Sequence, residues 1–267
     1  MILQFRQKTI HYQLYGTGPD WVLALHGYGE SGESFRALAE ILGDRYRFIC
    51  PDLPLHGETT WSEDCMLPSD LADMTQLFLT KYSISQITLA GYSMGGRLAI
   101  TLVTEIPERI KSIWLMAPDG WVINPWYRFA TQTGMGNRIF KIVMERPKIL
   151  LKGFDLARRI RLVDRSRYKF AGYFLNDPTE RQALYDRWTC YRKCHPDKKQ
   201  LVRILQEHQI SIVQFFGELD RIIRPEGARW IQSALPQLVQ THILKTGHRL
   251  LDPAIAPNIA RILINAR

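Results

Sequence analysis

The pentapeptide from Gly91 to Gly95 constrains the fold of this 267-residue chain more than any other segment. It places Ser93 between two glycines, after the apolar run 87–90 and before a stretch that predicts a helix. A turn this tight between a strand and a helix leaves no room for side chains two residues either side of its centre. The serine hydroxyl then projects above the strand end, beside the N–H groups that open the helix. This arrangement is typical of a nucleophile elbow.

Short apolar runs alternate with amphipathic stretches through the first 118 residues and again from residue 210. The apolar runs predict buried strands, and the stretches between them predict helices. Such alternation implies an α/β fold, with a mostly parallel central sheet flanked by helices. The predicted strands are 2–5 and 10–14, which could form a hairpin, then 21–25, 48–50, 87–92, 113–116, 210–216 and 239–244. The predicted helices are 34–42, 69–82 with Ser69 as its cap, 93–105, 227–235 and 254–264.

The alternation stops between residues 119 and 209, where the sequence is helix-like, aromatic and basic. Residues 119–203 contain 19 Lys and Arg against 8 Asp and Glu, a net charge of +11, whereas the rest of the chain carries −2. Because the strand pattern then resumes, we interpret this segment as an insertion. The predicted domains are a core of 1–118 and 210–267, and an inserted helical, basic cap of 119–209 that follows the sixth strand.

Composition argues against several classes of protein. A chain with 46% hydrophobic and 23% charged residues is ordinary for a globular protein, and no apolar run approaches the roughly 18 residues that span a bilayer. Cys50, Cys65, Cys190 and Cys194 lack the spacing of metal ligands, so we expect no metal site, reduced thiols and a cytoplasmic location. The basic segment shows no nucleic-acid-reading motif, so we expect no nucleic-acid partner.

A serine nucleophile needs a base, usually a histidine that a carboxylate orients. Asp220 and His248 each come just after one of the last two predicted parallel strands. The carboxyl ends of parallel strands meet at one edge of a sheet, where ligands bind in open α/β folds. We therefore expect Ser93, Asp220 and His248 to meet there, with His248 as the base.

Asp119 is the alternative acid, because it follows the strand 113–116. We favour Asp220, which stands in a Gly-x-x-Asp arrangement after its strand. Glu218 lies closer to the same strand end and is expected to face solvent.

The chain resembles serine hydrolases of the α/β-hydrolase fold superfamily over residues 1–118 and about 210–267. The resemblance rests on the serine motif, on the order Ser, Asp, His, and on two upstream motifs. These are His26-Gly27-Tyr28-Gly29, which is similar to the oxyanion loop of that family, and Asp52-Leu53-Pro54-Leu55-His56-Gly57, in which Leu55 stands where glycine is usual. The insertion occupies the place of the family's lid or cap.

The resemblance implies acyl transfer without a metal or organic cofactor. It implies that the N–H groups of Tyr28 and Met94 hold the oxyanion, while His26 orders the oxyanion loop or lies near substrate. The expected activity is hydrolysis of a small carboxylic ester or thioester. Carbon–carbon bond hydrolysis is an alternative in the same fold, and a small-ligand receptor is an alternative outside catalysis.

Two features bear on the substrate. The run from Ser93 to Leu98 also resembles the elbow of the menaquinone-pathway synthase that eliminates pyruvate, in which an arginine matching Arg97 helps hold a substrate carboxylate. Arg97 could instead form a salt bridge with a loop. The basic insertion could attract anionic substrates or an acidic membrane surface, with Trp121 lining an acyl pocket, or its arginines could form a solvated face.

Overall fold

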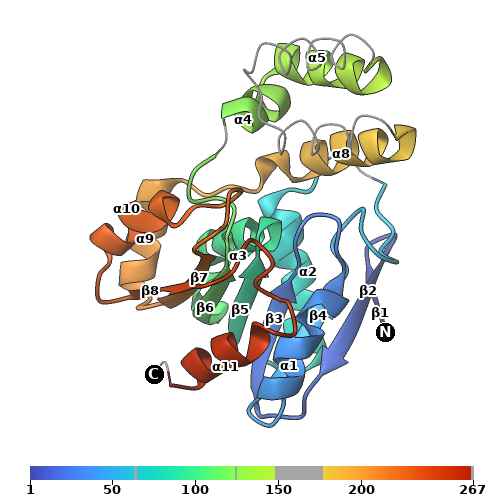
Figure 1. Ribbon diagram of the computed structural model, residues 1–267. Helices are drawn as coiled ribbons and strands as arrows, with labels where there is room; N and C mark the ends of the chain where they lie inside the picture. Colours follow the sequence, from blue (N-terminus) through green and yellow to red (C-terminus); the bar gives the residue numbers. More distant parts are fainter. Residues whose placement is uncertain (63–64, 124, 148–176, 266–267) are drawn as a thin grey trace. The chain divides into compact units, whose positions relative to one another are not determined.

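A mostly parallel, eight-stranded sheet is the framework of the protein, in a computed structural model that describes residues 1–62, 65–123, 125–147 and 177–265 (Figure 1). The strands are β1 (Ile2–Phe5), β2 (Lys8–Tyr15), β3 (Asp20–Leu25), β4 (Tyr46–Pro51), β5 (Ile87–Tyr92), β6 (Ile110–Met116), β7 (Ser211–Gly217) and β8 (Val239–Leu244). Their order is β1-β2-β4-β3-β5-β6-β7-β8. β2 pairs antiparallel with β1 and β4, and the later neighbours pair parallel. The predicted fold class and the N-terminal hairpin are confirmed.

Helices flank both faces of this sheet. The helices around it are α1 (Arg36–Leu42), α2 (Pro68–Lys81), α3 (Met94–Glu105), α9 (Lys198–Glu207), α10 (Arg229–Ala234) and α11 (Ala256–Asn265). α1 contacts α11, and α3 contacts α2 and α9. Figure 1 shows α1 and α11 on one face of the sheet and α2 and α3 on the other.

The central strands β3 to β7 are buried on both faces over most of their length, which explains why their sequences are largely apolar. Successive side chains of a strand point to opposite faces. In β3, Val22 and Ala24 belong to the core cluster that includes Leu38 of α1 and Ile259 of α11. Leu23, from the same strand, is also fully buried but lies outside that cluster. The sheet therefore separates two layers of core.

The start of α2 differs from the sequence-based expectation. Ser69 was predicted as its cap, but the helix begins at Pro68, and the N-cap residue is Leu67. Proline suits the first helical position, because its missing N–H would have no partner in the helix. The side chain of Asp70 accepts a hydrogen bond from the Leu67 N–H at 2.9 Å. Asp70 also pairs with Arg6 at 2.6 Å, which ties this helix end to the residues that follow β1.

The chain divides into two units, and the boundaries differ from those of the predicted insertion. The larger unit contains residues 1–62, 66–122 and 193–267, and the smaller contains 63–65 and 123–192. Residues 193–209, predicted as part of the cap, belong to the larger unit, because α9 buries its apolar face and contacts α3.

The regular elements that the structure describes in the smaller unit are helical. They are α4 (Pro125–Gln132), α5 (Gly134–Glu145), α8 (Pro178–Cys190) and a short 3-10 turn (Tyr191–Lys193) that crosses the boundary. Much of the arginine-rich part of the segment, 148–176, lies outside the described residues. Among the residues that are described, no helix is both long and apolar enough to cross a bilayer.

The glycines around Ser93 are required by close backbone approaches. A Cβ atom at Gly91 would lie 2.6 Å from the Gly95 carbonyl oxygen, and one at Gly95 would lie 1.9 Å from the carbonyl oxygen of Leu25. Real Cβ atoms essentially never come this close to backbone. The expectation that a side chain could not fit two residues either side of the serine is confirmed. The first turn of α3 thus lies directly against the end of β3.

We expect Gly95→Ala to lower the free energy of unfolding by about 2–4 kcal/mol, because its methyl group would clash with backbone that cannot move aside cheaply. Urea unfolding followed by circular dichroism measures the change. Gly247→Ala is the control, since a Cβ at that position meets no atom within 4 Å. Equal stability of the two variants would contradict the close approach.

Candidate active site

Ser93 occupies a strained turn between β5 and α3. Its φ of 49° and ψ of −113° lie outside the conformations that non-glycine residues usually adopt. Backbone hydrogen bonds to neighbouring segments hold the turn: the Ser93 N–H donates to the carbonyl of Met116, the last residue of β6, at 2.9 Å. The Ser93 carbonyl accepts from the N–H groups of Gly96 at 3.0 Å and Asp119 at 2.8 Å. The surrounding sheet therefore imposes the geometry of the serine.

Ser93, His248 and Asp220 form a continuous chain of hydrogen bonds. The Nε2 atom of His248 lies 3.1 Å from the Ser93 Oγ, and its Nδ1 atom lies 2.7 Å from Oδ2 of Asp220. The Asp220 side chain is fully buried, whereas that of His248 keeps 19% of its surface exposed. The structure thus brings together the three residues that the sequence predicted as a unit, although they lie 28 and 155 positions apart.

The surroundings of Asp220 favour its ionised form. Burial opposes ionisation, but the hydrogen bond with His248 and the N–H groups of Ile222 and Ile223 outweigh it and lower the pKa of Asp220. Those two N–H groups donate to its Oδ1 at 2.7 and 3.0 Å. A carboxylate at Nδ1 holds the proton of a neutral imidazole on that nitrogen. The Nε2 atom is then an acceptor that faces the Ser93 hydroxyl.

The loops that carry Asp220 and His248 are joined along their backbones. The N–H of Leu219 donates to the carbonyl of Thr246 at 2.9 Å. A Cβ atom at Gly217 would lie 2.1 Å from the Gly247 carbonyl oxygen, so only glycine permits this approach. The joined loops fix the distance between the carboxylate and the imidazole.

The alternative acids have other environments. Asp119 forms an ion pair with Arg97, with 3.6 Å between its Oδ2 and the Arg97 Nε, while His248 takes Asp220 as its partner. Glu218 is exposed, as expected. The Arg97 side chain keeps only 5% of its surface exposed. This placement matches a salt bridge with a loop, which was one of the two roles that the sequence suggested for Arg97.

His26 orders the loop that follows β3. Its ring is fully buried, its Nε2 accepts a hydrogen bond from the Leu53 N–H at 2.9 Å, and its Nδ1 lies 2.7 Å from the Gly27 carbonyl. Since the Leu53 N–H can only donate, Nδ1 must carry the ring proton. The prediction that His26 contacts substrate does not fit this placement, because both nitrogens bind backbone. Its predicted role in ordering the loop does fit.

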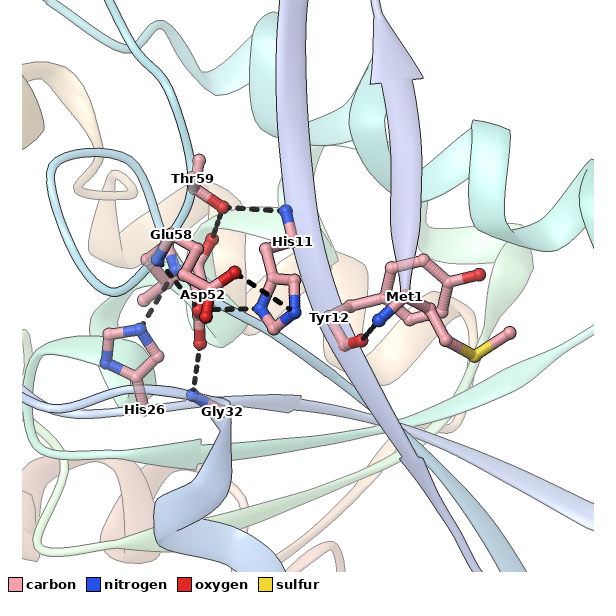
Figure 2. Close-up of polar contacts among 9 residues, drawn as sticks. Met1, His11, Tyr12, His26, Gly32, Asp52, Glu58 and Thr59 are labelled. Carbon is pink, nitrogen blue, oxygen red and sulfur yellow. Dashed lines mark hydrogen bonds and ion pairs between the residues drawn. The ribbon is translucent and has the colours of Figure 1, made fainter.

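Asp52 is the centre of a second network that supports the same loop (Figure 2). Its Oδ1 accepts from the Gly32 N–H at 2.8 Å, and its Oδ2 accepts from the Glu58 N–H at 3.1 Å and lies 3.0 Å from the His11 Nδ1. Burial opposes its ionisation, but the Gly32 and Glu58 N–H groups and His11 prevail and lower the pKa of Asp52. The carboxylate thus links the segments that follow β3 and β4 with β2.

Leu55 adopts the left-handed conformation, with a φ of 64°. Glycine reaches this conformation without steric cost, whereas a residue with a Cβ pays about 1–2 kcal/mol. This steric cost explains why the family motif that residues 52–57 resemble usually has glycine at this position. The departure leaves the neighbouring network intact, since Asp52 still binds the N–H of Gly32.

Tyr92 and Glu30 were not identified by sequence reasoning. The Tyr92 hydroxyl donates to the His248 carbonyl at 3.2 Å, and the centres of the two rings lie 5.4 Å apart. The only sequence signal was a large aromatic residue beside the serine. Glu30 accepts a hydrogen bond from the Gly27 N–H at 3.3 Å, and burial raises the pKa of its carboxyl group. The partner of Tyr92 lies 156 positions away in the sequence, and Glu30 binds across its own loop.

Trp121 is part of the core of the larger unit. It is 2% exposed, its Nε1 donates to the Gln214 Oε1 at 2.8 Å, and its ring makes an edge contact with Trp230 at 5.7 Å. The prediction that Trp121 lines an acyl pocket does not fit this burial. Its aromatic neighbours in sequence suggested a pocket, but its partners come from β7 and α10.

The sequence profile described as alpha/beta hydrolase fold matches residues 20–253. The chain belongs to this family. The match spans the strands that carry Ser93, Asp220 and His248, so all three fall within the family's domain. It confirms the superfamily that the sequence motifs indicated.

Individual relatives agree with this family. The chain is 36% identical to pimeloyl-[acyl-carrier protein] methyl ester esterase of Nitrosomonas europaea over 109 residues, 41% of each protein. It is 23% identical to lipase 1 of Psychrobacter immobilis, over 90% of this chain and 75% of the lipase. The chain spans only about two fifths of the esterase and of one further curated relative.

Among solved structures, an alpha/beta hydrolase enzyme from a Medee basin deep-sea metagenome library superimposes with a TM-score of 0.72. The comparison covers 100% of this chain and 98% of that enzyme at 18% sequence identity. At this identity the likeness shows the fold alone.

We expect Asp52→Asn to lower the free energy of unfolding by about 2–3 kcal/mol at neutral pH, because the amide places a donor where the carboxylate accepts. The lowered pKa means that the carboxylate stabilises the folded state fully above its ordinary value of 3.8, and that this contribution disappears as pH falls through the folded-state pKa. The deficit of the variant should therefore shrink below about pH 4.

Urea unfolding at pH 7 and pH 3 measures this prediction. Glu218→Gln is the control, since that side chain is exposed, and its effect should stay within about 0.5 kcal/mol. A deficit for Asp52→Asn that does not change with pH would contradict the proposed electrostatic origin.

Proposed function

We propose that this protein is a serine hydrolase that cleaves a carboxylic ester or thioester, with Ser93 as nucleophile, His248 as base and Asp220 as the orienting carboxylate. Membership of the α/β-hydrolase family and relatives named lipase and esterase support hydrolase activity in general. The observation that carries the finer proposal is the hydrogen-bonded chain of 2.7 and 3.1 Å at the carboxyl ends of β5, β7 and β8.

In this mechanism the Nε2 of His248 takes the proton of the Ser93 hydroxyl as its oxygen attacks the substrate carbonyl carbon. The tetrahedral intermediate collapses, the bond to the leaving alcohol or thiol breaks, and His248 gives its proton to that group. Water then repeats the sequence on the acyl-enzyme and releases the acid. Asp220 stabilises the imidazolium that forms at each stage but keeps its charge throughout.

The negative charge that develops on the carbonyl oxygen is assigned to backbone donors. Met94 is the first residue of α3, so its N–H has no carbonyl partner one turn earlier within the helix. Tyr28 lies in the loop that His26 and Asp52 order, and its N–H is the second proposed donor. Each donor of this kind is typically worth roughly 3 kcal/mol in the transition state.

The esterase relative acts, by its name, on the methyl ester of an acyl-carrier-protein conjugate, and this supports an acyl substrate for the present chain. Elimination on a carboxylated substrate is less well supported, because Asp119 already pairs with Arg97. An anionic substrate, a cytoplasmic location and contact with an acidic membrane remain predictions.

We expect a fluorophosphonate probe to label the folded protein at Ser93, and Ser93→Ala to abolish labelling. We expect the same variant to reduce kcat/KM for short p-nitrophenyl esters by at least about 10³-fold. Ser233→Ala, on the exposed surface of α10, is the control and should behave as the unaltered protein. Folded protein that is neither labelled nor active would favour the receptor alternative.

We expect Tyr92→Phe to lower kcat roughly 3- to 10-fold with KM unchanged, which corresponds to one lost hydrogen bond of about 1 kcal/mol in the transition state. The variant keeps the ring beside His248 but loses the hydroxyl that holds the His248 carbonyl. Steady-state kinetics on a soluble ester measure the effect. An unchanged kcat, or a change in KM alone, would show that this contact does not position the base.

A further inference from the structure

Helix α5 of the smaller unit has two apolar sides, and among the residues that the structure describes only one of them is packed. Gly136 and Met144 are buried, and the helix contacts α4 and α8. In contrast, Met135, Ile139 and Ile142 are 69%, 45% and 57% exposed. Scattered apolar residues on a surface are normal, but a continuous group on one helix marks a contact surface.

The exposed residues form a single stripe. Met135, Ile139 and Ile142 follow each other at spacings of four and three residues, so successive members lie one helical turn apart. At 100° per residue they fall within a narrow arc of the helix, on the side opposite Met144. We name these three residues the α5 stripe.

The border of the α5 stripe is basic. Arg138 and Lys141 are exposed and lie along one side of it, and Arg146 is exposed just beyond the last turn. Glu145, the acidic residue of the helix, is exposed on the same side, between Arg138 and Lys141, so the border carries three cations and one anion. The whole segment 123–192 contains 15 Lys and Arg against 6 Asp and Glu, so its net charge of +9 equals that of the entire chain.

We infer that the α5 stripe and its basic border form a docking surface for an anionic lipid membrane. An amphipathic helix with large apolar residues beside Lys and Arg lies in the membrane interface, with its apolar side among the acyl chains and its cations at acidic headgroups. A second copy of the chain fits less well, because two units of net charge +9 would repel each other. A nucleic acid would use the cations but not the exposed stripe.

The test is co-sedimentation of the full chain with phosphatidylcholine vesicles that contain, or lack, phosphatidylglycerol. We expect binding to the anionic vesicles and release at about 0.5 M salt, since the attraction is screened within a few ångströms there. Met135→Ser with Ile142→Ser, and separately Arg138→Gln with Lys141→Gln, should each reduce the partition constant about tenfold or more.

Two matched controls accompany these variants. Ile41→Ser removes an exposed apolar residue from the larger unit, and Arg229→Gln removes an exposed cation there, and neither should change binding. Circular dichroism checks that the variants are folded, and fluorophosphonate labelling of Ser93 reports on the proposed chemistry independently. Failure of that labelling therefore leaves the docking test intact.

Several outcomes would overturn the inference. These are failure of the unaltered protein to bind anionic vesicles, or binding that the stripe and border variants leave unchanged. Loss of activity on long-chain soluble esters in the stripe variants, without vesicle binding, would show that the stripe contacts substrate. Concentration-dependent dimerisation that the stripe variants abolish, again without vesicle binding, would assign it to a second copy of the chain.

Discussion

The arrangement of the candidate site depends on one close approach of backbone, between the first turn of α3 and the end of β3. At Gly95 a Cβ atom would lie 1.9 Å from the carbonyl oxygen of Leu25, so the helix can start here only because this residue has no side chain. That contact places Ser93 in its strained conformation and aims the helix N-terminus at the space above the sheet. The loops that follow β7 and β8 supply the remaining groups, Asp220 and His248.

Parallel pairing then explains why residues so far apart in sequence meet. β5, β7 and β8 run in the same direction, so the loops that follow them emerge at one edge. Backbone hydrogen bonds join the loops that carry Asp220 and His248, while the Tyr92 hydroxyl ties the second of them to β5. Buried carboxylates at positions 52 and 220 are each satisfied by N–H groups, which offsets the cost of burying their charge.

Sequence reasoning succeeded where the signal is local or periodic. All eight strands of the sheet were predicted, and the signal is strongest for β3 to β7, because strands buried on both faces are largely apolar. It was less successful where partners come from elsewhere. Trp121 and His26 look like pocket residues by their position near motifs, but burial against Gln214 and against backbone gives them structural roles. The composition of the segment 193–209 suggested insertion, but α9 contacts α3, and the segment belongs to the larger unit.

By itself the sequence determined the fold class, the position of the tight turn and the three residues with complementary chemistry, since periodicity, glycine spacing and residue type are properties of short segments. The tertiary structure alone decided that Arg97 pairs with a loop carboxylate and that Tyr92 holds the histidine loop. These are contacts between side chains that different strands bring together. Their distances follow from sheet register and loop packing, which no short segment of the sequence encodes.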